Sequence, residues 1–221
     1  MALSLGKSSM PRPLRRGACS AGLAPIGGGA ETTGVIPIRA LRGQDAEDSG
    51  MPETPEGILA RLAALGIETR TVRHPPLFTV AESQALRGSL PGGHCKNLFL
   101  RPAKAAPGPH LLIVLEEDRK VSVNALGRAA GLGRVEMAPA EALRALLGVE
   151  PGAVTSLGMV NAPPGQVRIL LDADFLRKHE WVHVHPLVNT MTTAIRPADL
   201  LRFLESLGHR PELLAVPVAA G

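Results

Sequence analysis

Apolar and polar positions follow regular spacings from Met51 onward, and the first spacing is helical. Thr54 can cap a helix that starts at Pro55, because a hydroxyl accepts a free backbone N–H and proline lacks one. Gly66 follows the last apolar position and suits a helix C-terminus. Residues 67–74 then alternate between apolar and polar, which predicts a strand. The apolar stripe of the helix comprises Ile58, Leu59, Leu62 and Leu65.

A turn and a short helix are expected after this strand. Residues 74–78, HPPLF, have the composition of a turn. Thr79 and Glu82 match a capping box, in which the hydroxyl and the carboxylate each bind one free backbone N–H. This pattern predicts a short helix to about Leu86, followed by a loop at 87–95.

The remaining elements alternate irregularly between strands and helices. Apolar runs predict strands, and apolar residues three and four positions apart predict helices. Strands are expected at 96–101, 110–115, 134–137, 166–172 and 181–186, and helices at 123–131, 138–148 and 197–207. Residues 148–165 form a predicted loop, and 189–195 receive no assignment. Short, irregular connections favour an α+β fold with a mixed sheet over a doubly wound nucleotide-binding fold.

Residues 1–50 differ in composition from the rest of the chain. They are rich in Gly, Ala, Pro, Ser and Arg, and they contain no acidic residue before Glu31. A secretion signal is disfavoured because the apolar pieces are short and broken by Gly and Pro. We expect either a disordered extension or an upstream start codon, with Met51 as the initiator. The segment has six basic and four acidic residues, so the remainder keeps +2 of the net charge of +4.

Composition excludes several classes of protein. The 221 residues are 45% apolar, which suffices for a globular core, and no apolar run is long enough for a transmembrane helix. Cys19 and Cys95 lack the spacing of a disulfide framework or a zinc site, which fits a reducing cytoplasm. One Trp, four Phe and no Tyr cannot form an extended platform for stacking bases. The net charge of +4 is too small to identify a polyanionic partner.

Sequence motifs of the common hydrolases and nucleotide-binding enzymes are missing, and three polar clusters remain. The first is Lys96 and Asn97 at the start of a predicted strand. A lysine there can hold a phosphate or polarise a carbonyl. An asparagine can orient the bound group, because its amide both donates and accepts hydrogen bonds. The alternative is an edge lysine beside a turn asparagine. Adjacent strand residues point to opposite faces, so one of the two should face inward unless the strand starts with a bulge.

The other two clusters lie in the C-terminal half. Residues 148–161 contain three glycines and a proline, and their backbone N–H groups could hold an oxyanion, although such loops often only turn the chain. His185 could transfer a proton beside Asn189, or it could be a satisfied histidine before a proline turn. His183 and His185 share a strand face and could bind a metal, but no third ligand is evident. Cys95 is interpreted as a small buried residue.

Four segments together resemble a known family. They are HPPLFTVAES (74–83), GGHCKNLFL (92–100), GVEPGAVTSLGMVN (148–161) and HPLVNTMTTAI (185–195), and DLLRFLESLGH follows the last of them. Their order and spacing resemble the YbaK-like aminoacyl-tRNA deacylases, which edit mischarged prolyl-tRNA. The free-standing ProX-type alanyl-tRNA(Pro) deacylases are the most similar members. The resemblance covers about residues 52–212, essentially all of the part expected to fold.

This resemblance implies a fold, a reaction and a set of site residues. The fold is α+β, with a mixed, largely antiparallel sheet partly closed into a barrel and flanked by helices. The reaction, without metal or other cofactor, is hydrolysis of the ester between a wrong amino acid and the terminal adenosine of tRNA(Pro), helped by the ribose hydroxyl. Lys96, Asn97 and His185 match the catalytic positions. The matching substrate-binding positions are Thr79, Gly152, Thr155, Ser156, Gly158 and Asn189.

Two residues depart from the family pattern. Ser156 replaces a proline of the glycine loop, and Ala162 replaces an acidic residue after the loop's asparagine. Both substitutions bear on which amino acid is removed. Deacylation of Cys-tRNA or Ser-tRNA, and non-catalytic binding of aminoacyl-tRNA or of a synthetase, are therefore alternatives to deacylation of Ala-tRNA(Pro).

The resemblance also implies an organisation and partners. We expect an extension at 1–50, an editing domain at 51–212 and a C-terminal tail at 213–221. The expected partner is the acceptor end of tRNA(Pro), and prolyl-tRNA synthetase or an elongation factor is a candidate for docking. A cytoplasmic location without a membrane fits this assignment.

Overall fold

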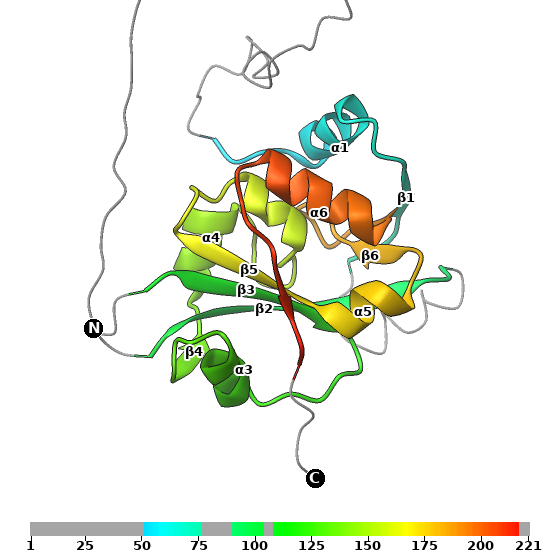
Figure 1. The fold of residues 1–221 in the computed structure, drawn as a ribbon. Coiled ribbons are helices and arrows are strands. Elements are labelled where there is room, and N and C mark those ends of the chain that lie inside the picture. Colours follow the sequence, from blue (N-terminus) through cyan, green and yellow to red (C-terminus); the bar gives the residue numbers. More distant parts are fainter. Residues whose placement is uncertain (1–50, 77–89, 104–107, 217–221) are drawn as a thin grey trace, which may run out of the picture. The chain divides into compact units, whose positions relative to one another are not determined.

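The computed structural model describes residues 51–76, 90–103 and 108–216. The helices are α1 (Pro55–Ala64), α3 (Val123–Ala129), α4 (Ala140–Leu147), α5 (Ala173–Lys178) and α6 (Pro197–Ser206), and a 3-10 helix, η2, spans Ser156–Val160. The strands are β1 (Thr69–Arg73), β2 (Gly93–Pro102), β3 (His110–Glu116), β4 (Val135–Met137), β5 (Val167–Asp172), β6 (Val182–Val184), β7 (Met191–Ile195) and β8 (Glu212–Leu214), as Figure 1 shows. The predicted helix from Thr79 to Leu86 and the predicted extension at 1–50 lie outside the described residues.

Local sequence explains where α1 begins and where α4 ends. In α1, Oγ1 of Thr54 accepts a hydrogen bond from the N–H of Gly57 at 3.0 Å, and Pro55 is the first residue. The hydroxyl thereby replaces a partner that the first helical turn lacks. Helix α4 ends at Gly148, which has a φ of 63°, a left-handed conformation that costs other residues about 1–2 kcal/mol. Both ends agree with the sequence prediction.

Strand β2 lies in the middle of the sheet and joins its two parts. The strand order is β1-β7-β6-β2-β3-β5-β8, and β4 pairs with the C-terminal end of β2. Four of the seven pairings are antiparallel, and three are parallel: β2 with β6, β3 with β5, and β5 with β8. The prediction of an α+β fold with a mixed sheet is therefore confirmed.

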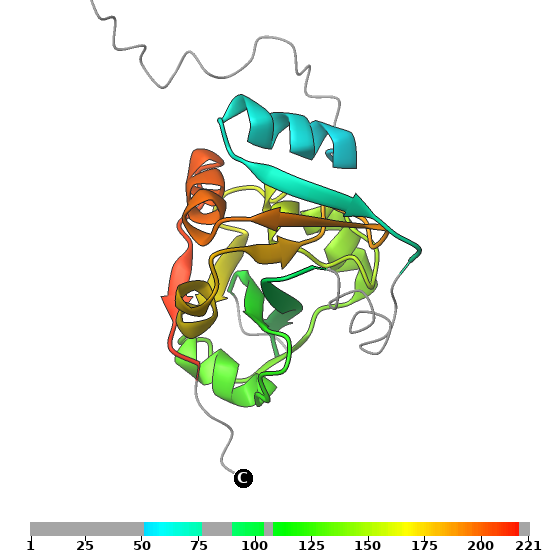
Figure 2. The ribbon, with the colours of Figure 1, turned by 90° about the vertical axis from the view of Figure 1, so that its right-hand side faces the viewer.

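The sheet is open within the described ranges. Strands β1 and β8 are the outer strands of the order, and no pairing connects them. β8 has only three residues, and four of the five residues of β1 are exposed, so neither strand offers a long apolar edge for closure. The expected partial barrel is therefore not supported. Figure 2 shows β1 beside β7, with α1 next to it.

Apolar side chains pack on both faces of the sheet, because side chains alternate along each strand. On one face, Phe99 and Val114 pack with residues of α1, α4 and α6, and on the other, Leu100 and Leu115 pack with Leu126 of α3. Figure 1 shows α1, α4 and α6 on one side of the strands and α3 on the other. The described part of the chain contains no helix that is long and apolar enough to cross a membrane.

Four short elements were not predicted from the sequence: η2, α5, β7 and β8. Strand β7 is fully buried, but its sequence, MTTAI, has two adjacent threonines and no alternation that would mark it as a strand. Strand β8 pairs with β5 in parallel and buries Leu214. It starts at Glu212, the last residue of the predicted domain, and continues into the predicted C-terminal tail.

Gly148 lies where the loop 148–161 approaches the segment before α1. A Cβ added here would lie 2.6 Å from Nδ2 of Asn161 and 2.7 Å from Cβ of Pro52. The same Nδ2 donates to the carbonyl of Leu147 at 2.9 Å, so Asn161 closes the loop onto the end of α4. Gly148 therefore combines a left-handed conformation with close packing.

We expect Gly148→Ala to lower the free energy of unfolding by about 3 kcal/mol, because backbone strain adds to the displacement of neighbours. Gly131→Ala is the matched control: Gly131 has a φ of 72°, but no described atom lies within 4 Å of an added Cβ. It should lose only about 1 kcal/mol. Urea unfolding followed by circular dichroism measures both variants, and equal losses would show that the contacts of Gly148 contribute nothing.

Candidate active site at the start of strand β2

Lys96 and Asn97 lie near the start of β2, which pairs there with both β3 and β6. The register with β3 is continuous from Cys95 to Leu100, so β2 has no bulge at this point. Lys96 and Asn97 therefore point to opposite faces of the sheet. Asn97 shares the face of Phe99, and Lys96 shares the face of Leu100.

The Lys96 side chain is half-buried and makes one contact with the main chain. Its Nζ donates a hydrogen bond to the carbonyl of Arg119, in the turn that follows β3. A lysine ammonium has three N–H donors, so two are left for a ligand. Phosphate and carbonyl oxygens are suitable acceptors for them.

On the opposite face of β2, Asn97 contacts Cys95. Nδ2 of Asn97 donates to Sγ of Cys95 at 3.8 Å, and this Sγ donates to the carbonyl of His183 on β6 at 3.1 Å. Oδ1 of Asn97 is buried, and no described residue donates a hydrogen bond to it. A buried acceptor without a donor costs about 1–3 kcal/mol, so a ligand that supplies a donor would be favoured there.

Cys95 is not activated as a nucleophile. Burial raises the pKa of its thiol to about 12, and the negative charge of Glu117 acts in the same direction. Because the thiolate is the reactive form, a neutral thiol attacks an ester poorly. The structure therefore agrees with the interpretation of Cys95 as a packing residue.

His185 follows directly after β6 and is held by β7. Its Nδ1 lies 3.0 Å from the carbonyl oxygen of Met191, and since a carbonyl only accepts, Nδ1 carries the proton. Burial lowers the pKa of His185 below its ordinary value, and the bond to Met191 and the charge of Glu117 offset this only in part. The ring is therefore neutral near pH 7, and Nε2 can accept a hydrogen bond.

The pairing of β2 with β6 brings Lys96 and His185 to adjacent chain segments. The strands run parallel, with His94 opposite His183, and Lys96 and His185 each lie two residues further along. The rings of His94 and His183 stack with 4.4 Å between their centroids, which supports this register. The pairing itself ends at His94 and His183, so it places Lys96 and His185 on neighbouring segments without a direct contact between their side chains.

Most of the predicted substrate-binding residues in the loop 148–161 are buried. Gly152 is exposed, whereas Thr155, Ser156 and Gly158 are buried. Oγ1 of Thr155 caps η2 by accepting a hydrogen bond from the N–H of residue 157 at 3.2 Å. Oγ of Ser156 is fully buried and finds no hydrogen-bond partner in the described residues. This hydroxyl therefore has unused hydrogen-bonding capacity within the described part of the chain.

The turn between β6 and β7 contains Asn189, which is half-buried. This turn holds Leu187 at a φ of 66°, uncommon for a residue with a Cβ, and its N–H donates to the carbonyl of His185 at 2.9 Å. Such backbone conformations persist where the surroundings impose them. Thr79, the remaining predicted contact, lies outside the described residues.

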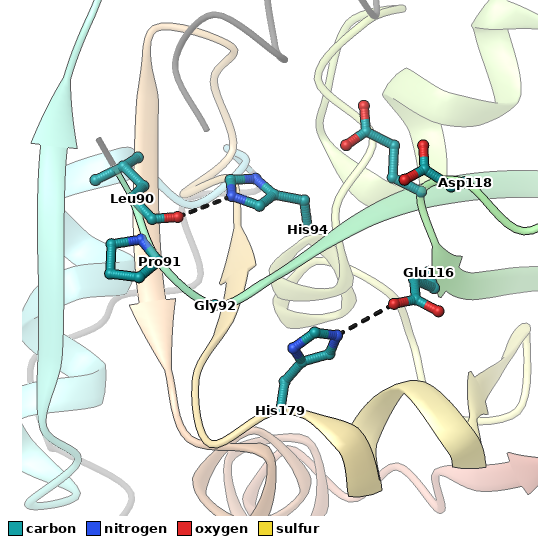
Figure 3. A pocket seen from close by; sticks show the side chains of 8 residues that line it. Leu90, Pro91, Gly92, His94, Glu116, Asp118 and His179 are labelled. Atoms are coloured by element: carbon teal, nitrogen blue, oxygen red, sulfur yellow. Dashed lines mark hydrogen bonds and ion pairs between the residues drawn. The ribbon is translucent and has the colours of Figure 1, made fainter. Parts of the chain in front are cut away.

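A pocket of about 220 Å³ opens beside the start of β2, and Figure 3 shows its lining. Nε2 of His94 donates to the carbonyl of Leu90 at 3.1 Å, and Nε2 of His179 lies 3.2 Å from Oε1 of Glu116. The lining residues are Leu90, Pro91, Gly92, His94, Glu116, Glu117, Asp118 and His179. None of the predicted site residues lines this pocket, although the charge of Glu117 acts on His185.

The acidic residues of this pocket were not predicted, because a run of Glu and Asp after a strand is typical of a solvated turn. Within the described ranges, no three His, Cys, Asp or Glu side chains are arranged to hold a metal ion. Nε2 of His183 instead donates to the carbonyl of Pro91 at 3.2 Å.

The mixed sheet and this set of polar residues agree with one class of protein. The profile of the family described as "Aminoacyl-tRNA editing domain" matches residues 74–203, more than half of the chain. The protein belongs to this family, and the resemblance seen in the four sequence segments is confirmed.

The names of individual relatives refer to prolyl-tRNA. "Prolyl-tRNA synthetase associated domain-containing protein 1" of Bos taurus is 37% identical over 157 residues, which cover 70% of this chain and 90% of the relative. The Mus musculus protein of the same name is 36% identical over 70% of this chain and 91% of its own. "Prolyl-tRNA editing protein ProX" of Acetoanaerobium sticklandii is 27% identical over 71% of this chain and 94% of its own.

A solved structure supports the shared fold. It is described as a candidate trans-editing enzyme for prolyl tRNA synthetase, and it superimposes with a TM-score of 0.54 at 22% sequence identity. The match covers 72% of this chain and 92% of the other.

The raised pKa of Cys95 predicts slow alkylation. At pH 8 only about 1 in 10,000 thiols with a pKa of about 12 is ionised, so iodoacetamide should modify native Cys95 at least about 100-fold more slowly than the urea-unfolded chain. Mass spectrometry of the peptide that contains Cys95 separates it from Cys19. Equal rates in the two states would show that the thiol is neither buried nor neutral.

Proposed function

We propose that this protein is a free-standing editing hydrolase that deacylates mischarged tRNA(Pro), with Ala-tRNA(Pro) as the preferred substrate. The observation that carries the proposal is the placement of Lys96 and His185 on adjacent chain segments, as a donor and a neutral acceptor. Membership of the aminoacyl-tRNA editing family and the names of the relatives supply the substrate class.

The chemistry needs few groups, because an aminoacyl ester is already activated. In the proposed reaction, water attacks the ester carbonyl, and negative charge develops on the carbonyl oxygen. Lys96 N–H donors stabilise this oxyanion or hold the terminal phosphate. Asn97 points to the opposite face of β2, so it would orient a different part of the substrate from the one that Lys96 holds. Nε2 of His185 accepts a hydrogen bond from water or from the ribose hydroxyl, which assists the attack. The bond to the ribose oxygen then breaks, and this oxygen takes up a proton.

Size selection explains why such an activity is useful. A synthetase pocket that fits proline cannot exclude alanine, because each missing methylene changes binding by only about 1–3 kcal/mol. A second site that admits the smaller group must therefore remove it. The buried hydroxyl of Ser156 lies in the loop assigned to the substrate, and the buried Ala162 follows this loop directly. We therefore expect these two residues to affect the amino-acid preference.

The proposed partners are the acceptor end of tRNA(Pro) and a protein of the translation apparatus, with prolyl-tRNA synthetase favoured by the names of the vertebrate relatives. The reaction would take place in the cytoplasm, where charged tRNA is made and used.

A deacylation panel tests the proposal. Purified tRNA(Pro) charged with Ala, Ser, Cys or Pro is incubated with the protein, and the remaining ester is counted over time. We expect Ala-tRNA(Pro) to be hydrolysed fastest and Pro-tRNA(Pro) at least about 100-fold more slowly. Equal hydrolysis of Pro-tRNA(Pro) would refute editing, and faster hydrolysis of the Cys or Ser ester would reassign the substrate.

Lys96→Ala should lower kcat/KM about 100- to 1000-fold, because one donor to the developing charge is lost. Lys120→Ala is the control, since Lys120 is exposed. It should retain activity within about twofold. Unchanged activity of Lys96→Ala, with the fold intact by circular dichroism, would place the catalytic site elsewhere.

The lowered pKa of His185 predicts the pH profile. Burial disfavours the charged ring, so the ring loses its proton below pH 6.5, and the neutral ring is the active form. The rate of Ala-tRNA(Pro) deacylation should fall at acid pH along a limb centred below 6.5 and should level off as the pH rises above the pKa of His185. His185→Asn should remove this limb along with most of the activity. A limb centred above 6.5 would contradict the assignment.

A further inference from the structure

Lys96 shares one row of the sheet with a buried acidic residue. Across β2 and β3, Lys96 is opposite Leu115, and across β3 and β5, Val114 is opposite Leu171, so Leu115 is level with Asp172. The lysine and the aspartate are on the same face, separated by Leu115. Two strand spacings amount to about 10 Å, which is too far for a direct ion pair between backbone-level positions.

Arg119 spans this gap with two different groups. Its main-chain carbonyl accepts the hydrogen bond from Nζ of Lys96, and Nε of its guanidinium lies 2.8 Å from Oδ2 of Asp172. A second ion pair, at 3.2 Å, joins the guanidinium to Asp174. The N–H of Arg119 also donates to the carbonyl of Glu116 at 3.0 Å, which closes the turn after β3. One residue thus connects Lys96 on β2 to Asp172 at the end of β5, on the same face of the sheet.

Asp172 is a rigid anchor for this connection. It is fully buried, and its Oδ1 accepts hydrogen bonds from the N–H groups of Asp174 at 3.0 Å and Phe175 at 3.3 Å, which caps α5. A buried carboxylate is tolerated only with partners that compensate its charge, and Arg119 supplies that charge. The guanidinium of Arg119 is therefore held at Asp172, and this contact restrains the main chain of Arg119 as well.

We propose that Arg119 is a positioning residue for Lys96, an inference that rests on the proposed deacylase function. A lysine stem has several rotatable bonds, and the side chain loses entropy when it is held in one conformation. The carbonyl of Arg119 holds Nζ beforehand with one of its three N–H groups and leaves two for the substrate. Arg119 itself touches no reacting atom, so its effect on catalysis passes through Lys96.

The first test measures the Lys96 side chain without any enzyme assay. The protein is treated briefly with an amine-specific N-hydroxysuccinimide ester, and modification of the Lys96 peptide is followed by mass spectrometry. We expect Arg119→Met to raise this rate about tenfold, equivalent to ~1.4 kcal/mol of lost restraint. Arg177→Met is the matched control, because Arg177 also pairs with Asp174 but has no contact with Lys96. It should leave the rate unchanged.

The second test is a double-mutant cycle on kcat for Ala-tRNA(Pro). Arg119→Met alone should lower kcat about tenfold with a smaller change in KM, and Lys96→Met alone should lower it further. In the Lys96→Met background, Arg119→Met should have no additional effect, because the residue through which it acts is gone. If Arg119→Met does not fold, Asp172→Asn serves instead, since an amide oxygen still caps α5 but no longer carries the charge.

The outcomes separate the two proposals. A wild-type protein that deacylates none of the charged tRNAs refutes the proposed function, while the labelling test still decides whether Arg119 holds Lys96. An active wild type with additive effects of the two substitutions, or with equal labelling of Lys96 in the Arg119 and Arg177 variants, overturns the positioning role.

Discussion

The structure depends on the short parallel contact between β2 and β6. It consists of two residue pairs, Gly93 with Val182 and His94 with His183, yet it joins β1, β7 and β6 to the other strands of the described sheet. The stacked histidine rings and a hydrogen bond of 2.8 Å from the N–H of Gly93 to the carbonyl of Trp181 reinforce it. Because this contact sets one half of the sheet against the other, it also decides which polar groups meet at its end.

How much of the fold could be predicted depends on how local the determining contacts are. The start of α1 and the end of α4 were predictable because Thr54 and Gly148 act within one turn of their own helix. Strand β7 was not, because its threonines are buried only after β1 and β6 pair on either side of it. The open sheet differs from the expected partial barrel for a similar reason, since closure depends on whether two distant edges, β1 and β8, can pair.

In the candidate site, too, the features set by local sequence were predictable and those set by long-range contacts were not. Lys96 and Asn97 were recognisable as a polar pair at a strand start, and the family's sequence pattern marked His185. The contact from Lys96 to Arg119, 23 residues away, is made through a main-chain carbonyl, and no side-chain pattern encodes that. The pocket beside β2 likewise combines His94 with His179, which approach because Phe175 and His179 pack against Gly93 at the start of β2.

Cys95 illustrates how burial shapes what surrounds a reactive position. It immediately precedes Lys96, and its hydrogen bond to the carbonyl of His183 helps to hold β6 against β2. Peroxide oxidises thiolates far faster than thiols, so a neutral, buried sulfur resists conversion to sulfenic acid. Oxidation of this sulfur would place a larger, polar group between the two strands that carry Lys96 and precede His185. The high pKa of Cys95 therefore disfavours oxidation at this strand junction.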